Sequence, residues 1–341
     1  MDQRQHSFCG AASSIKIFGE SAGAFSVCLL AISPLNKNLF QRVIAQSGSS
    51  LVDMAISKSP PNLVLLYSKL LNCAKPSTLN MVECLRGKSA KELQDVYDLI
   101  VLEYWKMNSY HPAYSDIALK PTVDGELIPD EPLKLLSDSS SASYKLFRSL
   151  DFIVRTTNME GSLLIGILSI LNINITNGIS TNVLCDQLSP GFAYGKKYNL
   201  KLSSQKICKQ YAVKDGNTSK LIEQGKQIFN LYGDDLFVSR AIALLNIHSN
   251  QNQQRNSFQY LFSKAIPRHL ELFPVPTWFE GSSHGAELFY LFTGYQLSTI
   301  FLVYRGLKKK SALNPNARDM TYWPKFTNKE KDYLDLDQII V

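Results

Sequence analysis

The feature that most constrains the fold is a predicted strand that passes through a short glycine-bounded turn directly into an apolar helix. Ser14–Phe18 alternates in polarity and carries β-branched residues, which is typical of a strand. Ala24–Ile32 is apolar and helix-compatible, and Pro34 closes it. The turn between them, Gly19-Glu20-Ser21-Ala22-Gly23, has the Gly-x-Ser-x-Gly spacing that lifts a serine hydroxyl above the edge of a sheet.

This turn predicts an activated serine. We expect Ser21 to be a nucleophile. We expect the backbone N–H of Ala22, at the start of the helix, to donate to a developing oxyanion. Both glycines are expected to be required, because a side chain at Gly19 or Gly23 would collide with the strand or the helix.

Three further strands are predicted, with long helical stretches between them. The strands are Arg42–Gln46, Phe152–Thr156 and Ser257–Phe262. Helices are expected from the Ser-x-x-Glu capping box at Ser89 to about Leu99, and over Gly161–Leu171. Strands that alternate with helices predict an α/β fold with a mostly parallel central sheet flanked by helices. The serine-rich stretch 137–143 is predicted to be a surface loop.

Composition excludes several classes of protein. The 341 residues are 45% hydrophobic, so the chain can bury a core in one large domain or two smaller ones. A net charge of +7 without a long basic block argues against nucleic-acid binding. No apolar run reaches the roughly 18–20 residues of a membrane span, and the first residues lack the apolar stretch of a signal peptide. Six cysteines are ordinary usage rather than a disulfide scaffold.

A serine nucleophile needs a histidine base, and the base needs a carboxylate to orient it. The five histidines are His6, His111, His248, His269 and His284. In the order Ser, acid, His, His6 is disfavoured because it precedes the serine, and His284 is favoured because it lies in a small-residue loop after the last strand. We expect His248 and His269 to be packed or surface histidines. From the residues alone, Glu160 just after a strand is only one of 29 acidic candidates.

Several segments together resemble the type B carboxylesterase/cholinesterase family of α/β-hydrolases. They are Ile17–Ala24, Ala45–Ser49, Cys84–Arg86, Pro121–Gly125, Asn158–Gly161, His284–Leu288 and Tyr322–Phe326. The resemblance implies an α/β-hydrolase domain over residues 1–341 and a triad of Ser21, His284 and Glu160. It implies that Glu20 is a buried structural residue, and it implies neither a cofactor nor a metal.

The chain departs from the family pattern in ways that bear on activity. The family has about a third of its fold before the serine turn, including a His-Gly-Gly-Gly type loop with further oxyanion donors, and we expect this chain to be a partial domain that lacks that third. With only Ala22 of those donors present, turnover by the chain itself is expected to be weak. Arg155 stands near a position where the family commonly has glycine. Met54 stands where cholinesterases have an acyl-pocket tryptophan, so the resemblance implies a general small carboxylic ester as substrate.

The resemblance also implies features of the secretory pathway. Cys73 and Cys84 match a disulfide loop of the family, and Cys9, Cys28, Cys185 and Cys208 remain unassigned, with Cys28 expected to be a buried hydrophobe. Asn174 and Asn217 begin glycosylation sequons. We therefore expect a protein that is secreted or held in the secretory lumen, with its signal peptide outside this chain. The oligomeric state stays open.

Two function hypotheses follow. The first is a serine carboxylic-ester hydrolase that acts through an acyl-enzyme. The second is a non-catalytic chain, either an inactive fragment or a cholinesterase-like binding or adhesion protein. Adhesion members of the family typically replace the Ser or the His, whereas Ser21, Glu160 and His284 are all present here.

Overall fold

The computed structural model describes residues 14–57, 60–107, 119–193, 199–214, 216–250, 255–292 and 324–335. The chain divides into two compact units, each made of segments that are not contiguous in sequence. The first contains residues 1–55, 123–166 and 226–341, and the second contains residues 56–122 and 167–225. Each unit is described by itself. The prediction of one domain over residues 1–341 stays a prediction.

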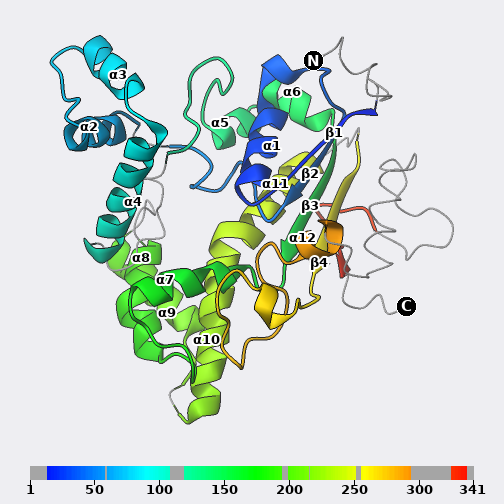
Figure 1. Cartoon of the computed structure of the whole chain (residues 1–341). Helices are drawn as coiled ribbons and strands as arrows, with labels where there is room; N and C mark the ends of the chain where they lie inside the picture. Colours follow the sequence, from blue (N-terminus) through cyan, green and yellow to red (C-terminus); the bar gives the residue numbers. More distant parts are fainter. Residues whose placement is uncertain are drawn as a thin grey trace. The chain divides into compact units, whose positions relative to one another are not determined.

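A five-stranded sheet forms the centre of the first unit (Figure 1). Its strands follow one another in chain order: β1 (Lys16–Glu20), β2 (Arg42–Gln46), β3 (Asp151–Thr157), β4 (Ser257–Phe262) and β5 (Leu334–Asp335). Every neighbouring pair is parallel. The predicted parallel sheet is therefore confirmed, and the carboxyl ends of β1 to β4 lie at one edge, where ligand sites of such sheets form.

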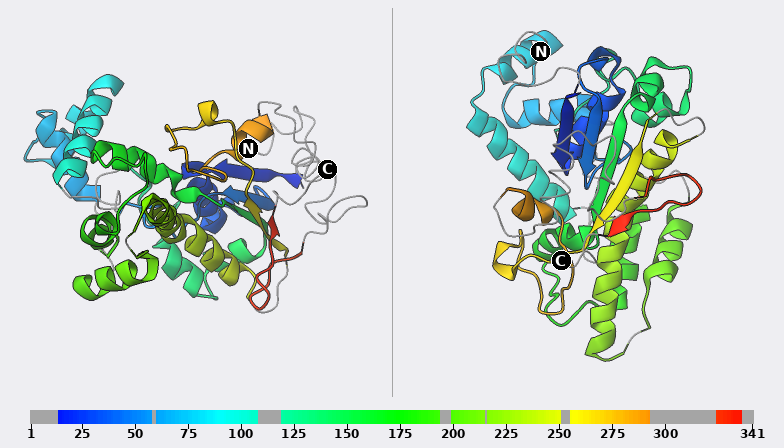
Figure 2. Two further views of the ribbon diagram at one scale, coloured as in Figure 1. Left: turned by 90° about the horizontal axis from the view of Figure 1, so that it is seen from below. Right: turned by 90° about the vertical axis from the view of Figure 1, so that its right-hand side faces the viewer.

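Helices cover both faces of this sheet (Figure 2). On one face α1 (Ala22–Ile32) packs against β1 and β2, and α11 (Ser239–His248) packs against β3. Two short helices, α5 (Pro132–Ser137) and α6 (Ala142–Arg148), pack against α1. On the other face α12 (Glu287–Phe292) covers an apolar cluster of side chains from β2, β3 and β4. The central strands β2 and β3 are buried almost throughout, whereas β1 is partly exposed.

The second unit is helical and contains two disulfides. Its helices are α2 (Pro60–Leu70), α3 (Thr78–Arg86), α4 (Ala90–Met107), α8 (Ser189–Ala193) and α9 (Leu200–Tyr211), and α7 (Leu164–Ile170) and α10 (Thr218–Gly233) contain residues of both units. Buried Leu63, Tyr67 and Ile100 form a small core beside the bridge between Cys73 and Cys84. A second bridge joins Cys185 to Cys208.

The predicted element boundaries differ from the observed ones at specific places. β1 begins at Lys16 rather than Ser14, because only Lys16 to Glu20 pair with β2. The capping box is present, with Glu92 Oε2 accepting from Ser89 N at 2.9 Å, but the helix continues to Met107 rather than Leu99.

Two further predictions were wrong in part. The helix expected from Gly161 is a 3₁₀ helix over Glu160–Leu163 followed by α7. The serine-rich stretch is not a loop throughout, because Ser141 Oγ accepts from Tyr144 N at 3.0 Å and so caps α6, in which Ser143 is buried.

Candidate active site

Ser21 lies in a strained backbone conformation at the carboxyl end of β1. Its φ is 56°, in the left-handed region that L-residues rarely adopt. Its backbone N–H donates to Gln46 O of β2 at 2.8 Å, and its carbonyl accepts from Phe25 N in the first turn of α1 at 3.0 Å. The strand therefore turns sharply into the helix at this serine, as the spacing predicted.

The glycines around the turn are not equally required. A Cβ on Gly19 would lie 2.3 Å from the backbone of Gly23, so the prediction for Gly19 is confirmed. At Gly23 no heavy atom of the described residues lies within 4 Å of such a Cβ beyond its own neighbours, so the predicted collision there is wrong. The close contact therefore involves the backbone of Gly23, and it restricts the side chain at position 19 rather than the one at position 23. A third glycine, Gly48, is equally confined, since its Cβ would lie 2.8 Å from Ser21 O.

Glu160 follows β3 and is almost completely buried. Its Oε1 accepts from Thr157 N at 2.7 Å and from Ser47 Oγ at 2.5 Å. The next residue must be glycine, because a Cβ on Gly161 would lie 1.8 Å from Phe229 O. Burial by itself would raise the pKa of Glu160, but His284, Arg155 and Ser47 stabilise the carboxylate and hold the pKa below its ordinary value.

His284 is oriented from both its backbone and its ring. Its backbone N–H donates to Ser162 Oγ at 2.9 Å, and its Nδ1 lies 2.6 Å from Glu160 Oε2. The ring packs at 4.8 Å between centroids against Phe237. Since a carboxylate only accepts, Nδ1 carries the proton in this bond and Nε2 is left as the acceptor of the neutral imidazole.

The remaining ring nitrogen of His284 has no hydrogen-bond partner within the described part of the chain. It lies 3.2 Å from Glu20 Oε1, the carboxylate that directly precedes Ser21. Burial raises the pKa of Glu20, although His284 and Arg155 oppose that rise. The structure thus brings Glu160 and His284 together and places Glu20 at the free nitrogen, while the expected bond from Ser21 to His284 is not formed.

Four polar residues around Glu160 were not predicted to have a role at the site. Gln46, Ser47, Arg155 and Glu287 are each fully or almost fully buried. Arg155 Nη1 donates to Ser47 Oγ, and its Nη2 pairs with Glu287 Oε1. Gln46 Nε2 donates to the same Oε1 at 3.0 Å. The signal available in the sequence was Arg155 itself, a charged residue that directly follows the apolar run Phe152–Val154 within β3.

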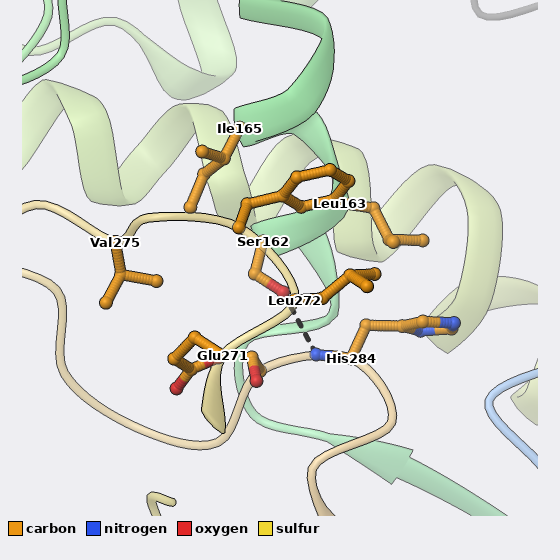
Figure 3. Close-up of a pocket in the computed structure, with 9 residues that line it drawn as sticks. Ser162, Leu163, Ile165, Glu271, Leu272, Val275 and His284 are labelled. Atoms are coloured by element: carbon orange, nitrogen blue, oxygen red, sulfur yellow. Dashed lines mark hydrogen bonds between the residues drawn. The ribbon is translucent and has the colours of Figure 1, made fainter. Parts of the chain in front are cut away.

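A small pocket lies behind the loop of His284 (Figure 3). It contains about 210 Å³ of space, part of it open to solvent, and its apolar lining includes Leu163, Ile165 and Val275. Figure 3 shows the imidazole of His284 pointing away from this pocket. The pocket is therefore on the other side of the loop from the Glu160–His284 pair.

The other candidate residues are distributed as follows. His248 is buried and His269 is exposed, as expected, and Cys28 is a buried free cysteine whose pKa burial raises to about 12. Asn174 and Asn217 are exposed, and their glycosylation stays a prediction. Four residues considered in the sequence analysis lie outside the described ranges: His6, Cys9, His111, and Trp323 of the segment Tyr322–Phe326.

The described residues include no group of three or more His, Cys, Asp or Glu side chains with the arrangement of a metal site. None of the helices in the described ranges combines the length and the apolar character that a membrane span requires.

Known proteins resemble this chain over almost all of its length. The sequence profile of the Carboxylesterase family matches residues 2–339. Bile salt-activated lipase of Mus musculus is 28% identical over 98% of this chain and 54% of its own length, and that of Bos taurus is 25% identical over 97% and 54%. Neuroligin-2 of Rattus norvegicus is 25% identical over 96% of this chain and 40% of its own.

The chain thus spans about half the length of the curated relatives it matches. The α/β-hydrolase fold of the family accounts for the parallel sheet and for the serine turn at the end of β1. From the profile match and the shared order of motifs, we conclude that the chain belongs to the carboxylesterase family.

Proposed function

We propose that the protein is a serine carboxylic-ester hydrolase in which Ser21, His284 and Glu160 form a catalytic triad. The observation that carries this proposal is the 2.6 Å contact between His284 Nδ1 and Glu160 Oε2, with Nε2 left unpartnered among the described residues. A buried carboxylate on one nitrogen leaves the other free to accept a proton. The strained φ of Ser21 supports its role as the nucleophile.

The proposed reaction has two halves. Ser21 Oγ attacks the ester carbonyl carbon while its proton moves to His284 Nε2, and the negative charge on the carbonyl oxygen is met by the N–H of Ala22. The tetrahedral species expels the alcohol, which takes the proton from His284, and leaves an acyl group on Ser21. Water then attacks the acyl-enzyme by the same proton transfers and releases the carboxylic acid.

Glu160 stabilises the imidazolium that forms in both halves. Its pKa below the ordinary value keeps it ionised at neutral pH, so it accepts the Nδ1 proton without taking it over. Ser162 holds the backbone of His284, and therefore the ring, in one position. The substrate we propose is a small neutral carboxylic ester.

The second candidate is a non-catalytic binding or adhesion protein. It is favoured by the absence of a Ser21–His284 hydrogen bond in the described structure and by the 3.2 Å approach of Glu20 to Nε2, where a substrate-ready serine would be expected. Relatives named lipase and relatives named neuroligin both match the chain, so the similarity does not choose between them. We also propose a secretory location, because two disulfides fit an oxidising compartment.

The deciding experiment uses the 341-residue chain, a fluorophosphonate probe and p-nitrophenyl acetate. We expect the probe to label Ser21, with the labelled peptide identified by mass spectrometry, and the S21A variant to lose both labelling and ester turnover. S26A is the matched control, since Ser26 lies in the helix α1 that follows Ser21, and its hydroxyl donates to Ala22 O. Ester turnover by this chain is expected to be weak, because Ala22 is the one oxyanion donor identified in it, so the labelling of Ser21 decides. A folded chain whose Ser21 the probe does not label would overturn the proposal in favour of the non-catalytic candidate.

A further inference from the structure

A network of four charged side chains adjoins the imidazole of His284: two carboxylates contact the ring, and the other two groups are linked to it through Glu160. Glu20, Glu160 and Glu287 contribute three carboxylates, and Arg155 is the one guanidinium among them. Arg155 is 0% exposed, and Glu160 and Glu287 are at most 2% exposed. Ionised groups this deeply buried are stable only when they are paired.

Arg155 reaches two of these carboxylates at once. Its Nη1 lies 3.6 Å from Glu160 Oε1 and donates to Ser47 Oγ, which in turn donates to the same Oε1 at 2.5 Å. Its Nη2 pairs with Glu287 Oε1. The planar fork of a guanidinium can make both contacts together, which a lysine ammonium cannot do in the same geometry.

The charge around His284 decides whether the imidazole can act as a base. Carboxylates within about 4–6 Å favour the protonated ring, and a protonated ring cannot accept a proton from Ser21. Glu160 at Nδ1 and Glu20 near Nε2 both act in that direction. Glu287 adds a third negative charge to the same network through its ion pair with Arg155. Arg155 is the cation that offsets them.

We propose that Arg155 is a positioning residue that acts through Ser47 and Glu160: it fixes the Glu160 carboxylate at His284 Nδ1 and offsets the surrounding negative charge, so that Nε2 can accept the proton of Ser21. This inference rests on the proposed function of the same site.

The groups that face His284 and its partners come from five elements. They are Glu20 of β1, Arg155 of β3, Glu160 of the following 3₁₀ helix, Tyr260 of β4 and Glu287 of α12. Tyr260 is paired with Arg155 in the sheet register and interacts with its guanidinium, and burial raises the pKa of the phenol, so it stays neutral. The balance of charge therefore depends on the three carboxylates and Arg155.

Three variants test the sign of the effect. R155M removes the positive charge at similar volume, E287Q removes one negative charge, and the double variant R155M/E287Q replaces the ion pair with a neutral pair. We expect the pH midpoint at which His284 takes up its proton to rise by about one unit in R155M, to fall in E287Q, and to return most of the way in the double variant. R148M is the matched control, because Arg148 binds backbone carbonyls of Ile247 and His248 beyond the other end of β3.

Two readouts keep this inference separate from the proposed function. The first is the NMR titration of imidazole carbons in the 341-residue chain with labelled histidine, with the His284 signal identified by H284Q. It requires no turnover. The second is the pH dependence of fluorophosphonate labelling at Ser21, whose acid limb should move with the NMR midpoint.

The outcomes are distinct. Opposite shifts in R155M and E287Q support the proposal even if the chain hydrolyses no ester. If R155M does not fold, the proposal is tested by the other two variants. The pH midpoint of His284 should fall in E287Q and should be close to the wild-type midpoint in R155M/E287Q. An unchanged His284 midpoint in the folded single variants, or equal shifts in R148M, would show that Arg155 is only a structural partner of Glu287 and would overturn the proposal.

Discussion

Replacing His248 with glutamine should make the protein less sensitive to acid. His248 ends α11 and is 1% exposed, between the rings of Phe147 and Phe152 at centroid distances of 4.8 and 5.4 Å. Its Nε2 lies 3.0 Å from Leu150 O, so Nε2 carries the proton, and its Nδ1, 2.7 Å from Ser257 Oγ, accepts from that hydroxyl. The neutral ring is thus fully hydrogen-bonded, and burial lowers the pKa of His248 from 6.5 to about 4.

The magnitude follows from linkage. Above pH 6.5 the His248 ring is neutral in both the folded and the unfolded state, so its titration does not change the free energy of unfolding. Below pH 6.5 the unfolded chain binds a proton that the folded chain does not bind until about pH 4, so the free energy of unfolding falls as the pH is lowered through this window. Each pH unit is worth about 1.4 kcal/mol, which makes a loss of about 2 kcal/mol by pH 5 and about 3 kcal/mol by pH 4.

The assay is urea unfolding, followed by circular dichroism, at pH 8 and pH 5 with disulfides intact. H248Q is expected to be less stable than wild type at pH 8, because the new amide fits the site less well, but to lose about 2 kcal/mol less between the two pH values. H269Q is the control, since His269 is exposed and should follow wild type. Equal losses in H248Q and wild type would refute the assignment of the acid sensitivity to His248.

Two further predictions concern packing and the second disulfide. G161A should fail to fold or lose several kcal/mol of stability, because its Cβ would lie 1.8 Å from Phe229 O. G23A, with open space at its Cβ, should be neutral or slightly stabilising. Similar thermal midpoints for the two variants would contradict this prediction. Opening the bridge in the C185S/C208S variant should lower the free energy of unfolding by about 3 kcal/mol, measured by urea titration, and an unchanged midpoint would show that the bridge does not form in solution.

The location of β1 to β4 along the chain and the position of the serine turn could be predicted from local pattern, whereas β5 was not predicted. β2 and β4 have the predicted bounds, and β3 differs by one residue at each end. Short runs rich in β-branched and aromatic residues favour extended backbone, so their limits are visible in the sequence. The serine turn was visible for a similar reason, because only glycine at position 19 permits the close passage of strand and helix.

Contacts between residues far apart in the chain could not be read in this way. Glu160 and His284 are separated by 124 residues, and among 29 acidic residues only the folded sheet selects which carboxylate meets the ring. The pairing of Cys185 with Cys208 has the same origin, since spacing does not encode which sulfurs meet.

Arg155 shows most clearly where local pattern stops being informative. Its place after the apolar run Phe152–Val154 of a central strand predicts an unfavourable buried charge. Only packing against Ser47 and Glu287, which come from other strands and helices, makes that charge tolerable. Local composition and periodicity determine which segments form strands and helices because those forces act between near neighbours. The charge state of the site depends on burial and on partners that meet only when the sheet is assembled.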